Sequence, residues 1–269
     1  PEDSNDRPTI IIEAGQEAGT PPVRLALYVI EQLLSCSENI EMIEKARWVI
    51  LPSTNPDGQE FSRYRSSEYS SWKKNCKSSF DNMTVGVDIT RNFNTQWNSC
   101  PKVENGFSNI YPGPAADSEE ETVFINSVIE KYKEHAKVYL SIKRDGHHIG
   151  YPFAFNEIDP KNKEQLKHVA AEVAAKVNQR SSIHVFTNDS IYAIQGDAQC
   201  GHSVDAAFHA GIPLAFEMRV FIGSATRIMT KYQTLPQGFE TTLRNGYFNG
   251  IKELFNAVTN EKKYGKIIK

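Results

Sequence analysis

The chain has 269 residues, of which 39% are hydrophobic and 23% are charged, and its formal net charge at pH 7 is −3. This is the composition of a globular protein that can bury a sizeable core. The slightly acidic balance argues against a nucleic-acid partner, and no apolar run approaches the ~20 residues that a membrane span needs.

Short apolar runs alternate with longer amphipathic segments along the chain. The first run leads through a turn of small residues into a helix whose start is marked by Thr20 and Pro21. We expect strands at residues 9–13, 47–51, 138–142, 184–187 and 213–219, and helices at residues 22–35, 118–135, 161–179, 203–210 and 237–260. This alternation predicts an α/β fold with helices on both faces of a sheet.

One stretch, residues 52–114, is long, irregular and rich in Ser, Asn and Gly. An irregular region of that size inside a compact domain is usually functional. Because the chain shows no repeat, low-complexity tract or linker, we treat residues 1–269 as a single domain.

Cysteines and glycosylation sequons bear on the cellular compartment. None of the four cysteines forms a CxxC pair, which excludes a zinc-ribbon or thioredoxin motif. N-glycosylation sequons begin at Asn82 and Asn188. Together these features favour a secreted, disulfide-containing glycoprotein.

Six phrases, in order, resemble the zinc metallocarboxypeptidases of the pancreatic carboxypeptidase A/B group. They are LPSTNPDGQEFS (51–62), SSWKKN (70–75), VGVDITRNFN (85–94), YLSIKRDGHHIGYPFAF (139–155), SIYAIQGDAQCGHSVDAAF (190–208) and GIPLAFEMR (211–219). The resemblance implies a mixed, mostly parallel, twisted sheet of eight strands with helices on both faces. The family's first strands and helix would lie upstream of Pro8, so we expect them to be absent from this chain, either removed or supplied as a separate chain.

The resemblance also implies a metal site whose ligands have been replaced. Family members hold one catalytic zinc with a His-x-x-Glu pair and a later His. Here the pair falls on Gln16 and Gly19, and the third ligand falls on Lys143. Glutamine is a poor zinc ligand, glycine has no side chain and a protonated lysine repels a cation. We therefore expect no zinc and no other cofactor.

Glu217, in the phrase AFEMR, stands where the family places its general base. That base acts on a zinc-bound water, so loss of the metal implies loss of turnover. Since a buried carboxylate needs a partner, we expect Lys143 to replace the charge of the zinc and to form a salt bridge with Glu217. A separation above about 4 Å would contradict this.

Two cationic positions resemble the substrate-binding residues of the family. Arg91 matches the arginine that clamps the substrate's C-terminal carboxylate, although Thr90 replaces the asparagine that precedes it. Lys73 stands where an arginine polarises the scissile carbonyl. The alternative for Arg91 and Lys73 is ordinary structural ion pairing.

Three further positions match the flap and the specificity pocket of the family. Tyr192 matches the flap tyrosine that covers bound peptide. Val204 falls where side-chain preference is set, and it implies a hydrophobic pocket that His202 partly fills. An aliphatic residue at a helix start is also commonly a core residue.

The resemblance guides one disulfide. Cys100 is close to a family disulfide cysteine whose partner position is Thr84, and Cys76 lies just upstream of that position. We therefore predict Cys76–Cys100, which closes a loop of ~25 residues worth about 3 kcal/mol. Cys36 and Cys200 have no family guide: they pair with each other, stay buried, or bond to the missing N-terminal segment.

These expectations combine into a catalytically inactive carboxypeptidase homologue, a secreted pseudoenzyme whose old cleft binds a peptide C-terminus, a small anion or another protein. Its own missing N-terminal segment is a further candidate partner. One alternative is a secreted storage or carrier protein with a closed cleft. The other is a carboxypeptidase with an atypical metal site.

Overall fold

A six-stranded sheet forms the centre of the molecule in the computed structural model, which describes residues 7–64, 72–78, 85–180, 185–221 and 238–265. Its strand order is β2-β1-β3-β6-β4-β5. Neighbouring strands are parallel, except that β4 is antiparallel to β6. The strands are β1 (Thr9–Ala14), β2 (Arg47–Leu51), β3 (Ala136–Arg144), β4 (His148–Tyr151), β5 (Thr187–Ser190) and β6 (Leu214–Val220).

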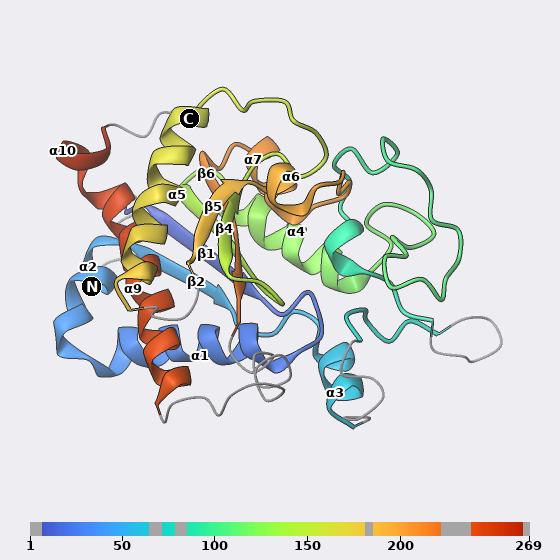
Figure 1. Cartoon of the computed structure of the whole chain (residues 1–269), viewed down its shortest axis with the longest axis horizontal. Helices are drawn as coiled ribbons and strands as arrows, with labels where there is room; N and C mark the ends of the chain where they lie inside the picture. The colour runs from blue at the N-terminus through green and yellow to red at the C-terminus, as the bar shows by residue number, and fades with distance from the viewer. Residues whose placement is uncertain (1–6, 65–71, 79–84, 181–184, 222–237, 266–269) are drawn as a thin grey trace.

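Helices pack on both faces of this sheet, as Figure 1 shows. The long helices are α1 (Thr20–Ser35), α4 (Glu120–Tyr132), α5 (Lys163–Asn178) and α9 (Phe239–Thr259). The shorter ones are α2 (Ile40–Lys45), α3 (Pro56–Tyr64), α6 (Ile191–Gln195), α7 (Ser203–His209) and α10 (Glu261–Tyr264), with 3₁₀ turns at Ser37–Asn39 and Ile89–Arg91. The mixed, mostly parallel α/β fold expected from the sequence is confirmed. The sheet of the described residues has six strands, whereas the resemblance implies eight.

Side chains along the central strands alternate between two apolar cores, because successive residues of a strand point to opposite faces. On β1, Ile10 and Ile12 join the core under α1, α5 and α9, whereas Ile11 joins the core under α4 and α7. The same alternation runs along β3 and β6. It brings a row of polar side chains to the α4/α7 face near the carboxyl ends of the three strands: Glu13, Ser141, Lys143, Glu217 and Arg219.

One expected strand is wrong. Residues 184–187 were expected to form it, but His184 lies outside the described residues and the strand β5 begins at Thr187. The Phe186 N–H donates to Asn178 Oδ1 at 2.7 Å, and its carbonyl accepts from Asn178 Nδ2 at 2.9 Å. Phe186 is thus held by the end of α5, and the pairing with β4 falls to the polar residues that follow.

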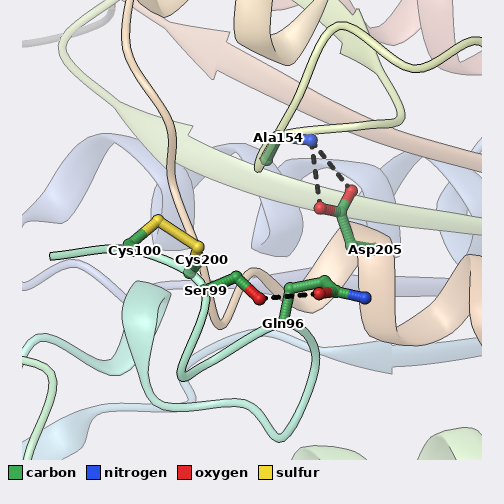
Figure 2. The surroundings of a disulfide bond; sticks show 6 residues. All are labelled: Gln96, Ser99, Cys100, Ala154, Cys200 and Asp205. Atoms are coloured by element: carbon green, nitrogen blue, oxygen red, sulfur yellow. Dashed lines mark hydrogen bonds between the residues drawn. A yellow bond between two sulfur atoms is a disulfide. The ribbon is translucent and has the colours of Figure 1, made fainter.

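The predicted Cys76–Cys100 disulfide is also wrong. Cys100 bonds to Cys200, with Cα atoms 5.8 Å apart (Figure 2). Cys36 and Cys76 are free. The backbone explains the pairing. Gly201 N–H donates to Thr95 O at 2.9 Å, which joins the loop before Cys100 to the segment that carries Cys200. The pairing therefore depends on two loops 100 residues apart in sequence.

None of the described helices combines the length and the apolar composition that would allow it to span a membrane.

Candidate functional site

Lys143 and Glu217 meet at the centre of the site. Lys143 lies near the end of β3 and Glu217 lies on the neighbouring strand β6. Lys143 Nζ is 3.0 Å from Glu217 Oε2, and both side chains are completely buried. The salt bridge expected from the sequence is confirmed.

A second cation, Arg219, contacts the other oxygen of the Glu217 carboxylate. Arg219 Nε donates to Glu217 Oε1 at 2.8 Å, and His148 Nε2 lies 3.6 Å from that oxygen. Burial by itself would raise the pKa of Glu217, but Arg219 and Lys143 outweigh it and hold the pKa well below its usual range. Glu217 is therefore a buried, ionised carboxylate between two cations.

His202 closes the site from the start of α7. Its Nδ1 accepts the Val204 N–H at 3.2 Å, which caps the helix. Its Nε2 lies 3.0 Å from Glu217 Oε2 and 2.7 Å from Lys143 Nζ. Burial, followed by the nearby Lys143 ammonium, lowers the pKa of His202 to about 4, so its ring is neutral at pH 7. The sequence placed His202 in a pocket, but the structure places it against the Lys143–Glu217 pair.

Glu17 is the residue of the β1–α1 turn that joins this network. Its carboxylate lies 3.1 Å from Arg219 Nη1 and 3.4 Å from Lys73 Nζ. Burial would raise the pKa of Glu17, but Arg219 and Lys73 outweigh it and lower the pKa to about 2. Sequence reasoning did not select Glu17, although it is the one charged side chain among residues 14–19.

Gln16 and Gly19, the turn positions that the resemblance matches to the family's zinc ligands, make their contacts outside the charged network. Gln16 Nε2 donates to Glu13 Oε2 at 2.7 Å. Gly19 lies at the start of α1, and its backbone N–H donates to Gln59 Oε1. The Gln16 side chain binds Glu13 and Gly19 has no side chain, so the turn contributes to the charged network through Glu17.

Glu13 forms a separate buried polar centre that the sequence analysis missed. Its carboxylate accepts hydrogen bonds from Gln16, from Thr54 Oγ1 at 2.9 Å and from Ser141 Oγ at 2.8 Å. Burial raises the pKa of Glu13. The signal in the sequence was a charged residue that continues an apolar run at the same strand parity as Ile11.

The residues expected to clamp a carboxylate lie in the 3₁₀ turn. Thr90 is buried and donates through its hydroxyl to Asp88 Oδ1 at 2.7 Å. Arg91 Nε lies 3.4 Å from Asp88 Oδ2, and the Arg91 side chain is 17% exposed. Arg91 lines a cavity beside the Cys100–Cys200 disulfide.

Lys73 forms structural ion pairs, as its alternative interpretation predicted. Besides its contact with Glu17, its Nζ lies 3.9 Å from Asp145 Oδ2. Tyr192 is half-buried in α6, where its backbone N–H donates to Phe153 O at 3.1 Å. Val204 is completely buried in the core under α4 and α7. The structure thus brings Lys73 into the charged network and places Val204 in the core.

Asp205, next to Val204 on α7, is a further buried acid that the sequence analysis did not use. Both of its oxygens accept the Ala154 N–H, at 3.1 and 3.0 Å (Figure 2). Burial raises the pKa of Asp205 to about 7. Asp205 therefore ties α7 to the backbone that follows β4.

Of the two sequon asparagines, Asn188 lies among the described residues and Asn82 does not. Asn188 is half-buried on β5, an edge strand of the sheet.

The residues that are described contain no group of three or more His, Cys, Asp and Glu side chains arranged to hold a metal ion.

Comparison with known proteins places this geometry in context. A family model described as zinc carboxypeptidase matches residues 1–244. Zinc carboxypeptidase A 1 of Drosophila melanogaster is 32% identical over 207 residues, which cover 75% of this chain and 46% of that protein. Mast cell carboxypeptidase A of Homo sapiens is 29% identical over 184 residues, which cover 66% of this chain and 42% of that protein. The chain thus spans about half the length of the curated relatives it matches.

Solved structures agree on the fold. Carboxypeptidase A from Helicoverpa armigera superposes with a TM-score of 0.83 at 22% identity, covering 97% of this chain and 63% of that one. Bovine thrombin-activatable fibrinolysis inhibitor, solved in complex with tick carboxypeptidase inhibitor, has a TM-score of 0.83 at 19% identity, covering 95% and 83% of the two chains.

Proposed function

Because the chain belongs to the zinc carboxypeptidase family, we propose that it is a member that does without the metal and does not hydrolyse peptides. One observation carries this proposal. The ammonium group of Lys143 lies 3.0 Å from Glu217 and 2.7 Å from His202, in a site from which water is excluded. The Lys143 ammonium thus places a positive charge beside Glu217, the residue that stands where the family has its general base.

The side chains around Lys143 do not fit a zinc ion. A catalytic zinc takes three nitrogen, sulfur or oxygen ligands at ~2 Å and keeps a position for water. Here one oxygen of Glu217 is engaged by Lys143 and the other by Arg219, which also binds Glu17. A divalent cation among these groups would be repelled by an ammonium and a guanidinium at low dielectric constant.

The same charges weaken Glu217 as a base. A general base is effective when its pKa lies near the working pH, whereas the pKa of Glu217 is held well below its usual range by its cationic partners. Zinc in this family would acidify a bound water, and without that effect water remains a poor nucleophile. Both arguments favour a non-catalytic role.

For the positive role, we propose a secreted binding protein. The Cys100–Cys200 disulfide supports an oxidising compartment, because such bonds are rare in the cytosol. The Arg91 side chain is 17% exposed, and it is the candidate for binding a carboxylate or another small anion. A peptide C-terminus and a protein partner both carry such groups.

A second role, storage or carriage with a closed cleft, is favoured by one specific observation. Lys143, His202 and Glu217 are completely buried, so their side chains fill the position of the former reaction centre. Under this alternative the outer surface of the protein carries the function. Peptide binding that requires Arg91 would favour the first role over this one.

The test is the zinc content and the peptidase activity of the purified chain. Protein incubated with excess zinc and then desalted is expected to contain well below one equivalent by elemental analysis. It is also expected to release no C-terminal residue from a peptide panel, with or without a chelator. One tightly held equivalent of zinc, or release that the chelator abolishes, would overturn the proposal. A Lys143→His variant that retains more zinc than the natural chain would identify Lys143 as the excluding group.

A further inference from the structure

A cavity of about 580 Å³ lies at the C-terminal end of α7. Its described walls come from the loop that follows the 3₁₀ turn at Ile89–Arg91, from Asp117, and from residues of α4 and α7. These two helices cover the same face of the sheet (Figure 1). The described lining includes neither Arg91 nor any residue of the charged network around Glu217. The cavity is therefore separate from both.

Amide side chains make up much of the polar lining. Asn94 and Gln96 are exposed, and Asn126 is half-buried. An amide carries both donors and an acceptor, so it can pair with a hydroxyl group in either direction. Figure 2 shows that the Gln96 amide oxygen accepts from Ser99 Oγ, at 2.8 Å, and that the amide nitrogen points away from Ser99. The wall thus suits a ligand whose groups both donate and accept.

The charges of the lining disfavour other kinds of ligand. Its described residues include no Lys or Arg, so they offer no cation to an anion. Glu130 pairs with Lys133 at 2.6 Å. The other carboxylate is Asp117, whose Oδ1 accepts the Asn94 N–H at 3.1 Å and Asn126 Nδ2 at 2.9 Å. A single carboxylate engaged in this way is a poor site for a metal ion, whereas a hydroxyl that donates to it forms a strong hydrogen bond.

His209 adds an oriented ring to the wall formed by α7. Its Nδ1 lies 3.0 Å from Thr95 Oγ1, and its ring stacks on Phe153 with the centroids 5.3 Å apart. Partial burial lowers the pKa of His209, so its ring is neutral at pH 7. The lining therefore gains another uncharged polar group, held by contacts on two sides.

The backbone of the lining is held in an uncommon conformation. Three of the described residues other than glycine have positive φ, and two of them, Gln96 at +50° and Asp117 at +54°, line this cavity. Such a conformation persists where the surrounding contacts impose it. Here the Asp117 N–H donates to Asn92 O at 2.6 Å. The polar side chains are thus placed before any ligand binds, which lowers the entropic cost of binding.

We propose that this cavity binds a neutral sugar unit, with hydroxyl groups on Asp117 and the amides and a C–H face against Ile129, Ala206 and Ala210. The volume of about 580 Å³ lies within the ~300–1,000 Å³ of typical ligand pockets. A free monosaccharide and the terminal unit of a glycan share this chemistry. The inference uses neither Arg91 nor the absence of zinc, so it is independent of the proposed function.

Titration of the full chain, followed by saturation-transfer NMR, tests the site. The probes are the methyl glycosides of glucose, galactose, mannose and N-acetylglucosamine. Glucuronate, which adds a negative charge, and cyclohexylmethanol, which lacks the ring hydroxyls, are the control ligands. Saturable binding of at least one glycoside, at least tenfold tighter than that of either control ligand, is expected. Tighter binding of a trisaccharide that ends in the preferred sugar identifies a glycan as the source, and equal or weaker binding identifies the free sugar.

Three variants assign the binding to the cavity. Ala206→Phe fills the space and should abolish binding. Asp117→Asn removes the charge but suits the positive φ, because asparagine tolerates that conformation, and a loss of at least fivefold is expected. His209→Phe keeps a ring on Phe153 but removes the ring nitrogens, and a severalfold loss is expected. Asp159→Asn, at an exposed ion pair with Lys163, is the matched control and should bind as the natural chain does.

Absence of saturable binding across the four glycosides would overturn the site, as would a control ligand that binds as tightly as the best glycoside. Unchanged binding in both Asp117→Asn and His209→Phe would overturn it too. Denaturation midpoints establish that each variant is folded, and these two variants decide the outcome if Ala206→Phe does not fold. Zinc-dependent hydrolysis with sugar binding intact would overturn the proposed function and leave the cavity, so the two failures are distinguishable.

Discussion

Lys143 Nζ and Glu217 Oε2 lie 3.0 Å apart on adjacent strands, and neither side chain is exposed to solvent. Ionised groups in such a place must compensate each other, because water cannot. Arg219, Glu17 and His202 complete the set of partners. The site is thus an internally balanced charged network, and several measurable properties depend on that balance.

Replacing Lys143 with methionine should destabilise the fold strongly. The change leaves Glu217 buried with Arg219 as its remaining close cationic partner, and breaking a buried pair typically costs about 3–5 kcal/mol. Urea denaturation at pH 7 measures the loss in the free energy of unfolding. Lys163→Met, which removes an exposed ion pair with Asp159, is the control and should change the free energy of unfolding little, because solvent screens such pairs.

The double variant Lys143→Met/Glu217→Gln isolates the interaction between the two groups. Because the neutral amide no longer needs a cation, the double variant should be less destabilised than the sum of the single variants predicts. Strict additivity would show that Lys143 and Glu217 contribute independently, contrary to the geometry.

Acid should destabilise the protein through His202. Its pKa is lowered to about 4 in the folded state against 6.5 ordinarily, so the unfolded chain binds the proton first. The stability contributed by the neutral ring is present above pH 6.5 and is lost as the pH falls towards 4. The shift corresponds to about 3 kcal/mol.

A His202→Gln variant tests this by difference. Glutamine does not titrate, and the stability of the natural chain relative to the variant should fall between pH 6.5 and 4. The difference is needed because Asp205, with its pKa raised to about 7 by burial, changes stability in the opposite direction over the same range. A difference that is constant with pH would contradict the assignment of a neutral, buried His202.

The disulfide should be worth several kcal/mol. It joins residues 100 positions apart, and a loop of that length corresponds to about 4–5 kcal/mol in the chain-entropy model. Cys200→Ser should therefore lower the free energy of unfolding by about 2–5 kcal/mol. Cys76→Ser serves as the control, because Cys76 is free.

Peptide mapping without reduction checks the pairing directly. Cys100 and Cys200 should appear in one linked fragment, and Cys36 and Cys76 should be alkylated once the protein is unfolded. A linked fragment that contains Cys76 would restore the pairing expected from the resemblance.

Gly201 should tolerate no side chain. Its φ is +73°, and a Cβ there would lie 2.2 Å from Arg91 O, a backbone atom that cannot turn away. Left-handed strain and steric overlap together should cost Gly201→Ala about 3 kcal/mol or more. Gly196 has a φ of +77° but open space around its Cβ position, so Gly196→Ala should cost about 1–2 kcal/mol. Equal losses in thermal or urea unfolding would show that the overlap is relieved.

Sequence reasoning succeeded where the information is local. The strand β1 and the helix α1 follow from an apolar run and from helical spacing within neighbouring residues. The Lys143–Glu217 pair was predictable because the resemblance to the family places both residues at one site, and they lie on adjacent central strands. Strand β5 was misplaced because the apolar residue Phe186 is held by Asn178 and not by the sheet.

In the turn at residues 14–19, a difference of one position decides which side chain the prediction selects. Gln16 and Glu17 are neighbours, yet one binds Glu13 beneath the site and the other binds Arg219 within it. A shift of one residue in a turn changes which side chain joins the charged network around Glu217. The sequence pattern identified the turn but not the side chain that it presents.

The sequence by itself determined the α/β alternation and the family, because these depend on residue types and short spacings. Only the tertiary structure decided that Cys100 meets Cys200, that His202 closes on Glu217 and that Arg91 lines a cavity. Those outcomes depend on loops far apart in the chain that share a few backbone hydrogen bonds. Their meeting is a consequence of the packed fold and leaves no periodic signal in the sequence.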